Sequence, residues 1–123
     1  MIVIESVNHI GLTVSDLERS IKFYRDMFDF EVIDKLSTAG VAYLKMADIV
    51  IGLYEVGKYS ANGDSNNKIS FYVDEEDFDD AVEELRELET KIVHGPENIR
   101  YGQSVVLLDP DGNQIELSYP KID

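Results

Sequence analysis

The sequence predicts an α+β fold made of two βαβββ modules, and three observations support this prediction. First, the strand-like run "NKISFYVD" (67–74) repeats "NHIGLTVS" (8–15) at an offset of 59 residues. Second, an amphipathic helical pattern follows each copy, and third, three further strand-like runs follow each helical pattern. Such a repeat indicates duplication of one supersecondary unit. We expect one domain, residues 1–123, in which the two sheets pair into an open cup with the helices outside.

The first strand of the first module is predicted from strict alternation over residues 7–14. Ile10, Leu12 and Val14 fall on one face, whereas His9, Gly11 and Thr13 fall on the other, as in a half-buried strand.

A helix follows, because "SDLE" (15–18) has the spacing of a capping box. Its apolar stripe consists of Leu17, Ile21, Tyr24 and Phe28. Three strands are then predicted, at residues 30–36, 40–46 and 48–56. The first module therefore spans residues 1–56, and the polar, glycine-containing segment 57–66 is predicted to be a linker.

The second module, residues 67–123, repeats this order. In its first strand Ile69, Phe71 and Val73 take the places of Ile10, Leu12 and Val14. The predicted helix has a stripe of Phe78, Ala81, Val82, Leu85 and Leu88. Strands are predicted at 91–99, 104–109 and 113–119, with a "DPDG" turn (109–112) before the last. The segment "GPENIRYGQ" (95–103) is also considered as a loop that closes over a ligand through Arg100 and Tyr101.

Composition narrows the function. The net charge of −14 argues against binding to a phosphate backbone, and ten of the 25 acids lie in residues 74–89, which fits one solvated helix face. The absence of cysteine excludes a thiol nucleophile and a thiolate metal site within the chain. No apolar run approaches the roughly 18 residues of a membrane span, and the N-terminus lacks a signal-peptide pattern. We expect a cytoplasmic protein.

Three stretches carry a resemblance to a known superfamily: "NHIGLTVSDLERSIKFYRDMFDFEV" (8–32), "KISFYVD" (68–74) and "DPDGNQIEL" (109–117). In this order they resemble glyoxalase I, the bleomycin-resistance proteins and the extradiol dioxygenases, also called the vicinal oxygen chelate superfamily. The resemblance implies the fold of that superfamily, with two βαβββ modules forming an open cup. It leaves the function open, because many chemistries share this scaffold.

In metal-dependent members, the resemblance implies ligands at four positions, here His9, Gly52, Lys68 and Glu116. Glycine has no side chain, and a protonated lysine has no lone pair to donate. Members that use two histidines and one carboxylate tolerate the loss at Gly52. The loss at Lys68 leaves two ligands, where catalytic zinc or iron sites normally have three. Strand parity places Glu55 on the opposite face. We therefore expect no metal and no other cofactor.

His9 and Glu116 are the candidate catalytic residues. His9 is interpreted either as a lining residue that hydrogen-bonds a neighbour, or as a general base or residual metal ligand. Lys68 is expected either to pair with Glu116 or to extend into solvent. The candidate ligand-binding residues, selected by strand parity, form a polar and aromatic lining suited to an organic molecule: Thr13, Tyr54, Lys68, Ser70, Tyr72, Gln114 and Ser118.

These inferences predict a homodimeric, metal-free protein that binds a small organic ligand. One alternative is a metal-dependent, glyoxalase-like lyase or isomerase that uses His9 and Glu116. A second alternative is a ligand-sensing module whose bound state is recognised by another protein.

Overall fold

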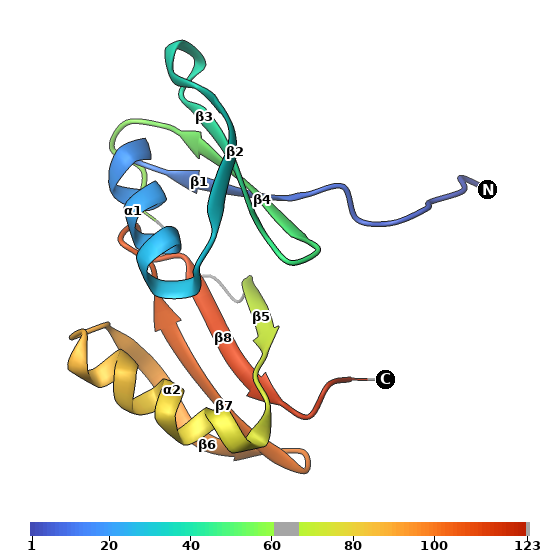
Figure 1. The fold of residues 1–123 in the computed structure, drawn as a ribbon, viewed down its shortest axis with the longest axis vertical. Coiled ribbons are helices and arrows are strands. Elements are labelled where there is room, and N and C mark those ends of the chain that lie inside the picture. The colour runs from blue at the N-terminus through green and yellow to red at the C-terminus, as the bar shows by residue number, and fades with distance from the viewer. Residues whose placement is uncertain (61–66, 123) are drawn as a thin grey trace. The chain divides into compact units, whose positions relative to one another are not determined.

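The computed structural model of the chain describes residues 1–60 and 67–122. The chain divides into two compact units, residues 1–60 and 61–123, and each contains one four-stranded sheet and one α-helix. Figure 1 shows each helix running along one face of the sheet of its own unit. The predicted α+β class and the order βαβββ in each half are confirmed. Neither α-helix of the described residues is long and apolar enough to cross a bilayer.

The first unit contains a mixed sheet with the strand order β1-β4-β3-β2. Its strands β1 (Ile10–Val14) and β4 (Ile49–Glu55) are parallel, and the other pairs are antiparallel. β2 (Glu31–Leu36) and β3 (Val41–Met46) are joined by a 3-10 turn, Ser37–Ala39. The parallel pairing places Gly11 beside Gly52 and Thr13 beside Tyr54.

Helix α1 (Leu17–Phe28) begins as predicted but is capped by a different residue. The Asp16 carboxylate accepts from the backbone N–H of Arg19 at 3.1 Å, whereas Ser15 Oγ accepts from the Arg19 guanidinium at 2.8 Å. The prediction from "SDLE" was wrong by one residue because both Ser15 and Asp16 are good N-caps. Leu17, Ile21 and Tyr24 are buried, as the apolar stripe predicts.

The Glu55 carboxylate lies at the N-terminus of α1, where Oε2 accepts from the backbone N–H of Leu17 at 2.7 Å. A helix N-terminus has free N–H groups and a positive dipole end, so a carboxylate is stabilised there. Glu55 therefore lies on the helix side of the sheet, as strand parity predicts.

The second unit has the same topology, with the strand order β5-β8-β7-β6. Its elements are β5 (Lys68–Tyr72), α2 (Glu75–Glu87), β6 (Ile92–Ile99), β7 (Gly102–Leu108) and β8 (Gln114–Tyr119), and β5 is parallel to β8. Phe78, Val82 and Leu85 of α2 are buried. Leu88 was predicted in the same stripe, but α2 ends at Glu87 and the Leu88 side chain is 54% exposed.

The segment 95–103, considered from sequence as a loop, is mostly strand. Residues 95–99 belong to the edge strand β6, and Arg100 and Tyr101 form the turn into β7. The pairing of β6 with β7 shifts on both sides of His94, so the edge strand accommodates Gly95 at φ 76° and Pro96. Gly and Pro therefore mark irregularities in a strand here rather than a loop.

The predicted turn at 109–112 is confirmed, and the buried side chain of Asp109 organises it. Its Oδ1 accepts from the backbone N–H groups of Asp111 at 2.9 Å and Asn113 at 2.8 Å, and Oδ2 accepts from Asn113 Nδ2 at 2.9 Å. Gly112 has φ 85°, a conformation that glycine adopts without strain.

Replacing Asp109 by alanine should lower the free energy of unfolding by about 2 to 3 kcal/mol, because buried donors then lose their acceptor. Asp109→Asn, which keeps one acceptor oxygen, should cost less. Urea denaturation of the two variants measures the difference. Equal losses would contradict this expectation, because they would mean that the one acceptor oxygen kept by asparagine does not stabilise the turn.

Candidate functional site

The predicted site residues form two groups, one in each unit. In the first unit His9 directly precedes β1, Thr13 lies on β1 and Tyr54 lies on β4. In the second unit Lys68, Ser70 and Tyr72 lie on β5, and Gln114, Glu116 and Ser118 lie on β8. The parallel register places Ser70 beside Glu116, Tyr72 beside Ser118, and Lys68 beside Gln114. The alternation of side chains puts these residues on one face of each strand.

In the first unit, His9 is held by hydrogen bonds at both ring nitrogens. Nδ1 lies 2.7 Å from Asn8 Oδ1, and Nε2 lies 2.9 Å from the Tyr54 hydroxyl. The Asn8 oxygen can only accept, so in the neutral ring Nδ1 carries the proton and Nε2 accepts from Tyr54. This tautomer leaves the lone pair of the imidazole on Nε2, on the side of Tyr54.

A second tyrosine extends this chain of hydrogen bonds. The hydroxyls of Tyr43 and Tyr54 lie 3.2 Å apart, and the rings of Tyr43 and His9 make an edge-to-face contact with centroids 5.3 Å apart. The hydrogen bond with Tyr43, together with partial burial, raises the pKa of the Tyr54 phenol. Tyr54 therefore remains a protonated donor to His9 at neutral pH.

Two glycines make room for the Tyr54 ring. A Cβ built on Gly52 would lie 2.9 Å from Tyr54 Cε2 and 3.1 Å from His9 Cδ2, and one on Gly11 would lie 3.3 Å from Tyr54 Cε2. Gly11 and Gly52 are register partners, so together they provide a flat patch of backbone beneath the ring. The missing side chain at Gly52 is thus a packing requirement of Tyr54 and His9.

In the second unit, Glu116 is held by an ion pair and a hydroxyl. Lys68 Nζ lies 3.2 Å from Glu116 Oε2, and Ser70 Oγ donates to Glu116 Oε1 at 2.7 Å. Ser70 also lies within 3.0 Å of Ser118 Oγ. Of the two alternatives for Lys68, pairing with Glu116 is therefore confirmed. The Glu116 side chain is 13% exposed and that of Lys68 is 40% exposed, so the carboxylate is the more buried partner.

A cavity of about 310 Å³ adjoins this group and lies entirely within the second unit. Four predicted residues line it, together with four others: Ser70, Tyr72, Glu116 and Ser118, and Arg100, Pro120, Lys121 and Ile122. The Lys121 ammonium lies 4.9 Å from the centre of the Tyr72 ring, in a cation–π contact, and Arg100 Nη2 reaches the Pro120 carbonyl at 3.4 Å. Gln114 lies on the same strand face but does not line the cavity.

Lys121 was missed from sequence because it follows the last strand, where strand parity no longer assigns a direction. Arg100 was considered only as part of a closing loop, and it is instead fixed in the β6–β7 turn. The signal that points to both residues is charge, because basic side chains are scarce in a chain with 25 acids and 11 bases.

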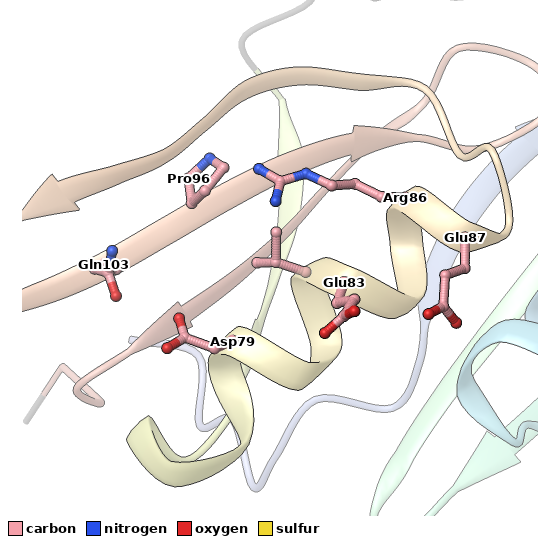
Figure 2. Close-up of a pocket in the computed structure, with 7 residues that line it drawn as sticks. Asp79, Glu83, Arg86, Glu87, Pro96 and Gln103 are labelled. Atoms are coloured by element: carbon pink, nitrogen blue, oxygen red, sulfur yellow. The ribbon is translucent and has the colours of Figure 1, made fainter.

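A larger cavity of about 560 Å³ lies between α2 and the strands β6 and β7. It is lined by Asp79, Val82, Glu83, Arg86, Glu87, Pro96 and Gln103, and Figure 2 shows Arg86 extending from α2 toward Pro96. Its lining contains none of the predicted site residues. It is bordered by the solvated acidic face of α2, so we assign the candidate site to the smaller cavity.

The side chains as they lie do not fit a three-ligand metal site. His9 has the right chemistry, because an oxygen acceptor orients its Nδ1–H as in a metal-bound histidine, but its Nε2 lone pair accepts from the Tyr54 hydroxyl. Glu116 has the right chemistry, but Lys68 and Ser70 contact its two oxygens. The protonated Lys68 cannot donate a lone pair. Residues 1–60 and 67–122 contain no cluster of three His, Cys, Asp or Glu side chains suited to a metal.

Comparison with known proteins establishes the family. The model of the Glyoxalase/Bleomycin resistance protein/Dioxygenase superfamily matches residues 6–117. The chain belongs to this superfamily. The resemblance found in the sequence is therefore confirmed.

Relatives within the glyoxalase superfamily include thiol transferases and a fosfomycin-resistance protein. The chain is 38% identical over 117 residues to the metallothiol transferase FosB of Staphylococcus epidermidis, covering 93% of this chain and 81% of the relative. It is 32% identical to the glutathione transferase FosA of Serratia marcescens, with 93% and 80% covered. A variant of FosX from Listeria monocytogenes, solved with Mn(II) and 1S,2S-dihydroxypropylphosphonic acid, matches with TM-score 0.84 and 25% identity over 98% and 94% of the two chains.

These findings overturn two expectations from sequence, namely a metal-free binding protein and the absence of a cofactor. The relatives are enzymes, FosB is named a metallothiol transferase, and the FosX structure holds Mn(II). The error was to infer loss of the metal from the single departure at Lys68. Replacing one donor weakens a metal site, but it does not remove the donors that remain at His9 and Glu116.

Gly52→Ala should lower the free energy of unfolding by about 1 to 3 kcal/mol, because the added methyl overlaps the Tyr54 ring. The cost should shrink when Tyr54 is also changed to alanine. Gly57→Ala is the matched control, since a Cβ at Gly57 meets nothing within 4 Å. Thermal or urea denaturation gives the comparison, and an equal effect at Gly52 with and without Tyr54 would show that the ring is not the obstacle.

The coupling between Lys68 and Glu116 is measurable by a double-mutant cycle. Lys68→Met and Glu116→Gln should each destabilise the protein, with a coupling free energy of about 1 kcal/mol, a modest value because Lys68 is partly exposed. Denaturation in low and high salt should show the coupling falling as salt screens the pair. Additive effects of the two substitutions would contradict the pairing.

Proposed function

We propose that this chain is a metal-dependent thiol transferase, which joins a small thiol to an anionic, electrophilic substrate such as fosfomycin. The observation that carries the proposal is the 38% identity to a metallothiol transferase over 93% of the chain. The chain has no cysteine, so the sulfur nucleophile must come from a thiol co-substrate. In the transfer, the thiol sulfur forms a bond to carbon, a carbon–oxygen bond breaks, and the thiol proton ends on the released oxygen.

The cavity in the second unit supports an anionic substrate. Arg100 and Lys121 line it, and Lys68 adjoins it as the partner of Glu116. These three bases outnumber the two nearby carboxylates, Glu116 and the Asp74 that accepts from Tyr72, and so give this region a positive balance in a chain whose net charge is −14. Such local charge attracts an anion and opposes its diffusion away. The volume of about 310 Å³ suits a small molecule.

The roles of individual residues follow from their chemistry. Ser70, Ser118 and Tyr72 line the cavity, and we assign them to substrate binding with Arg100 and Lys121. Tyr72 donates to Asp74, and this hydrogen bond raises the pKa of its phenol, so it remains protonated.

The remaining roles concern the reaction itself and the residues that position the reacting groups. His9 and Glu116 are the family ligand positions that keep a donor side chain, and we assign them to the chemistry of the reaction. We assign Thr13, Tyr54, Lys68 and Gln114 to positions around these groups. In the first unit Tyr54 contacts His9 directly, and its hydroxyl fixes the orientation of the His9 ring.

We also propose that the protein is a cytoplasmic homodimer. The described N-terminal segment exposes large apolar side chains that an isolated chain leaves in water: Met1, Ile2, Val3, Ile4 and Val7. A contiguous run of this kind is typical of a surface that a partner covers. We propose a second copy of the chain as the partner that covers this segment, because a homodimer requires no other protein.

The test is to incubate the purified protein with Mn(II), fosfomycin and either glutathione or L-cysteine. The phosphonate should be converted into a thiol adduct, and phosphorus NMR measures the conversion. Adduct should form only when protein, metal and thiol are all present, and a chelator should stop it. Arg100→Gln and Lys121→Gln should raise KM, because they remove charge from the cavity. Arg86→Gln, in the cavity behind the sheet, is the matched control and should leave KM unchanged.

No adduct with either thiol from metal-loaded, folded protein would overturn the proposal. Formation of the diol without thiol would place the chain with enzymes that add water instead. An equal effect of all three arginine and lysine changes would contradict the assignment of the substrate to the smaller cavity.

A further inference from the structure

We propose that the Lys68–Glu116 ion pair sets the metal affinity of this chain, so that a divalent cation binds Glu116 only after displacing the Lys68 ammonium. The inference rests on the metal dependence in the proposed function. It also accounts for the disagreement between metal-dependent relatives and a lysine at a ligand position. Lys68 is then an affinity-determining residue that lowers occupancy without abolishing the site.

The geometry shows why binding of the cation and of Lys68 is mutually exclusive. Lys68 Nζ contacts Oε2 of Glu116 at 3.2 Å while Ser70 Oγ donates to Oε1 at 2.7 Å. Both carboxylate oxygens are therefore engaged within the second unit. A cation that coordinates Oε2 takes the place of the Lys68 ammonium. If the ammonium stays close to Glu116, its positive charge repels the cation.

The exposure of the two partners indicates which one moves. The Glu116 side chain is 13% exposed and is held by Ser70, whereas the Lys68 side chain is 40% exposed on the edge strand β5. A lysine has four rotatable side-chain bonds and can carry its ammonium into solvent. The carboxylate thus stays in place, and the pair opens by rotation of Lys68.

Opening of the pair reduces the apparent affinity by the fraction of molecules in which Glu116 is free. A carboxylate suited to a metal can therefore coexist with weak metal binding. The internal repeat identifies the change that should reverse this effect. Lys68 occupies in the second module the place of His9 in the first, 59 residues earlier, and His9 presents a lone pair on Nε2.

The test is titration of Mn(II) into purified, metal-stripped protein, measured by calorimetry and by the electron paramagnetic resonance of free Mn(II). Lys68→Met removes the competing charge and should tighten binding about tenfold, the effect of one partly screened charge pair. Lys68→His adds a donor as well and should bind tighter than Lys68→Met. Each gain should also appear as a larger rise of Tm on adding Mn(II).

Two control variants separate direct competition from a general change of charge. Lys121→Met removes a lysine from the same cavity that contacts Tyr72 rather than Glu116, and should change the affinity much less than Lys68→Met. Glu116→Gln should abolish the gain in both Lys68 backgrounds. Circular dichroism establishes that each variant is folded. If Lys68→Met does not fold, Lys68→Gln, which can still hydrogen-bond Glu116, replaces it with the same expected direction.

Unchanged Mn(II) affinity in both Lys68→Met and Lys68→His would overturn the inference, as would an equal gain in Lys121→Met. A gain that survives Glu116→Gln would also overturn it, because the cation would then bind elsewhere. These outcomes are separate from those of the proposed function. The affinities can follow the expected order while no thiol adduct forms, and an adduct can form while Lys68 leaves the affinity unchanged.

Discussion

The two groups of candidate residues, one in each unit, depend on the same constraint, the parallel pairing of the first and last strands of their unit. β1 lies beside β4 and β5 beside β8, each in a register that matches residues directly. This pairing places Gly11 against Gly52 in one unit and Ser70 against Glu116 in the other. Because the helix covers the opposite face, the polar side chains of these strands can gather without disturbing the core. The chemistry of each half is therefore set by which residues this register pairs.

The same topology carries different chemistry in the two units. The first unit has one imidazole and two phenols, packed over glycine backbone. The second unit has an ion pair with hydroxyls and two further cations around a cavity. Duplication thus preserved the backbone while the residues on it diverged. One of these differences is the change from His9 to Lys68, which have equivalent places in the two repeats.

The strands and helices could be predicted because their apolar periodicity is strong, and the face of each site residue followed from parity. The cap of α1 could not be fixed, since Ser15 and Asp16 are both suitable caps. Residues 95–99 were predicted both as the end of a strand and as part of a loop, because glycine and proline are typical of loops but also occur at bulges on edge strands. Lys121 lies beyond the last strand, outside any periodic pattern. The expectation that the protein is metal-free failed for another reason. A sequence shows which metal-ligating residue is replaced, but it does not show how tightly the remaining ligands bind a metal.

The contact between Glu55 and the N-terminus of α1 has a consequence for the precision of the site. Tyr54 and Glu55 are neighbours on β4, and they point to opposite faces: Tyr54 to His9, and Glu55 to the Leu17 N–H. A slip of β4 by one residue would reverse both directions at once. It would withdraw the phenol from His9 and leave the helix end without its carboxylate. The hydrogen bond between Glu55 and the N-terminus of α1 therefore stabilises the register of β4. Through this register it also determines the orientation of the His9 ring on the opposite face of the sheet.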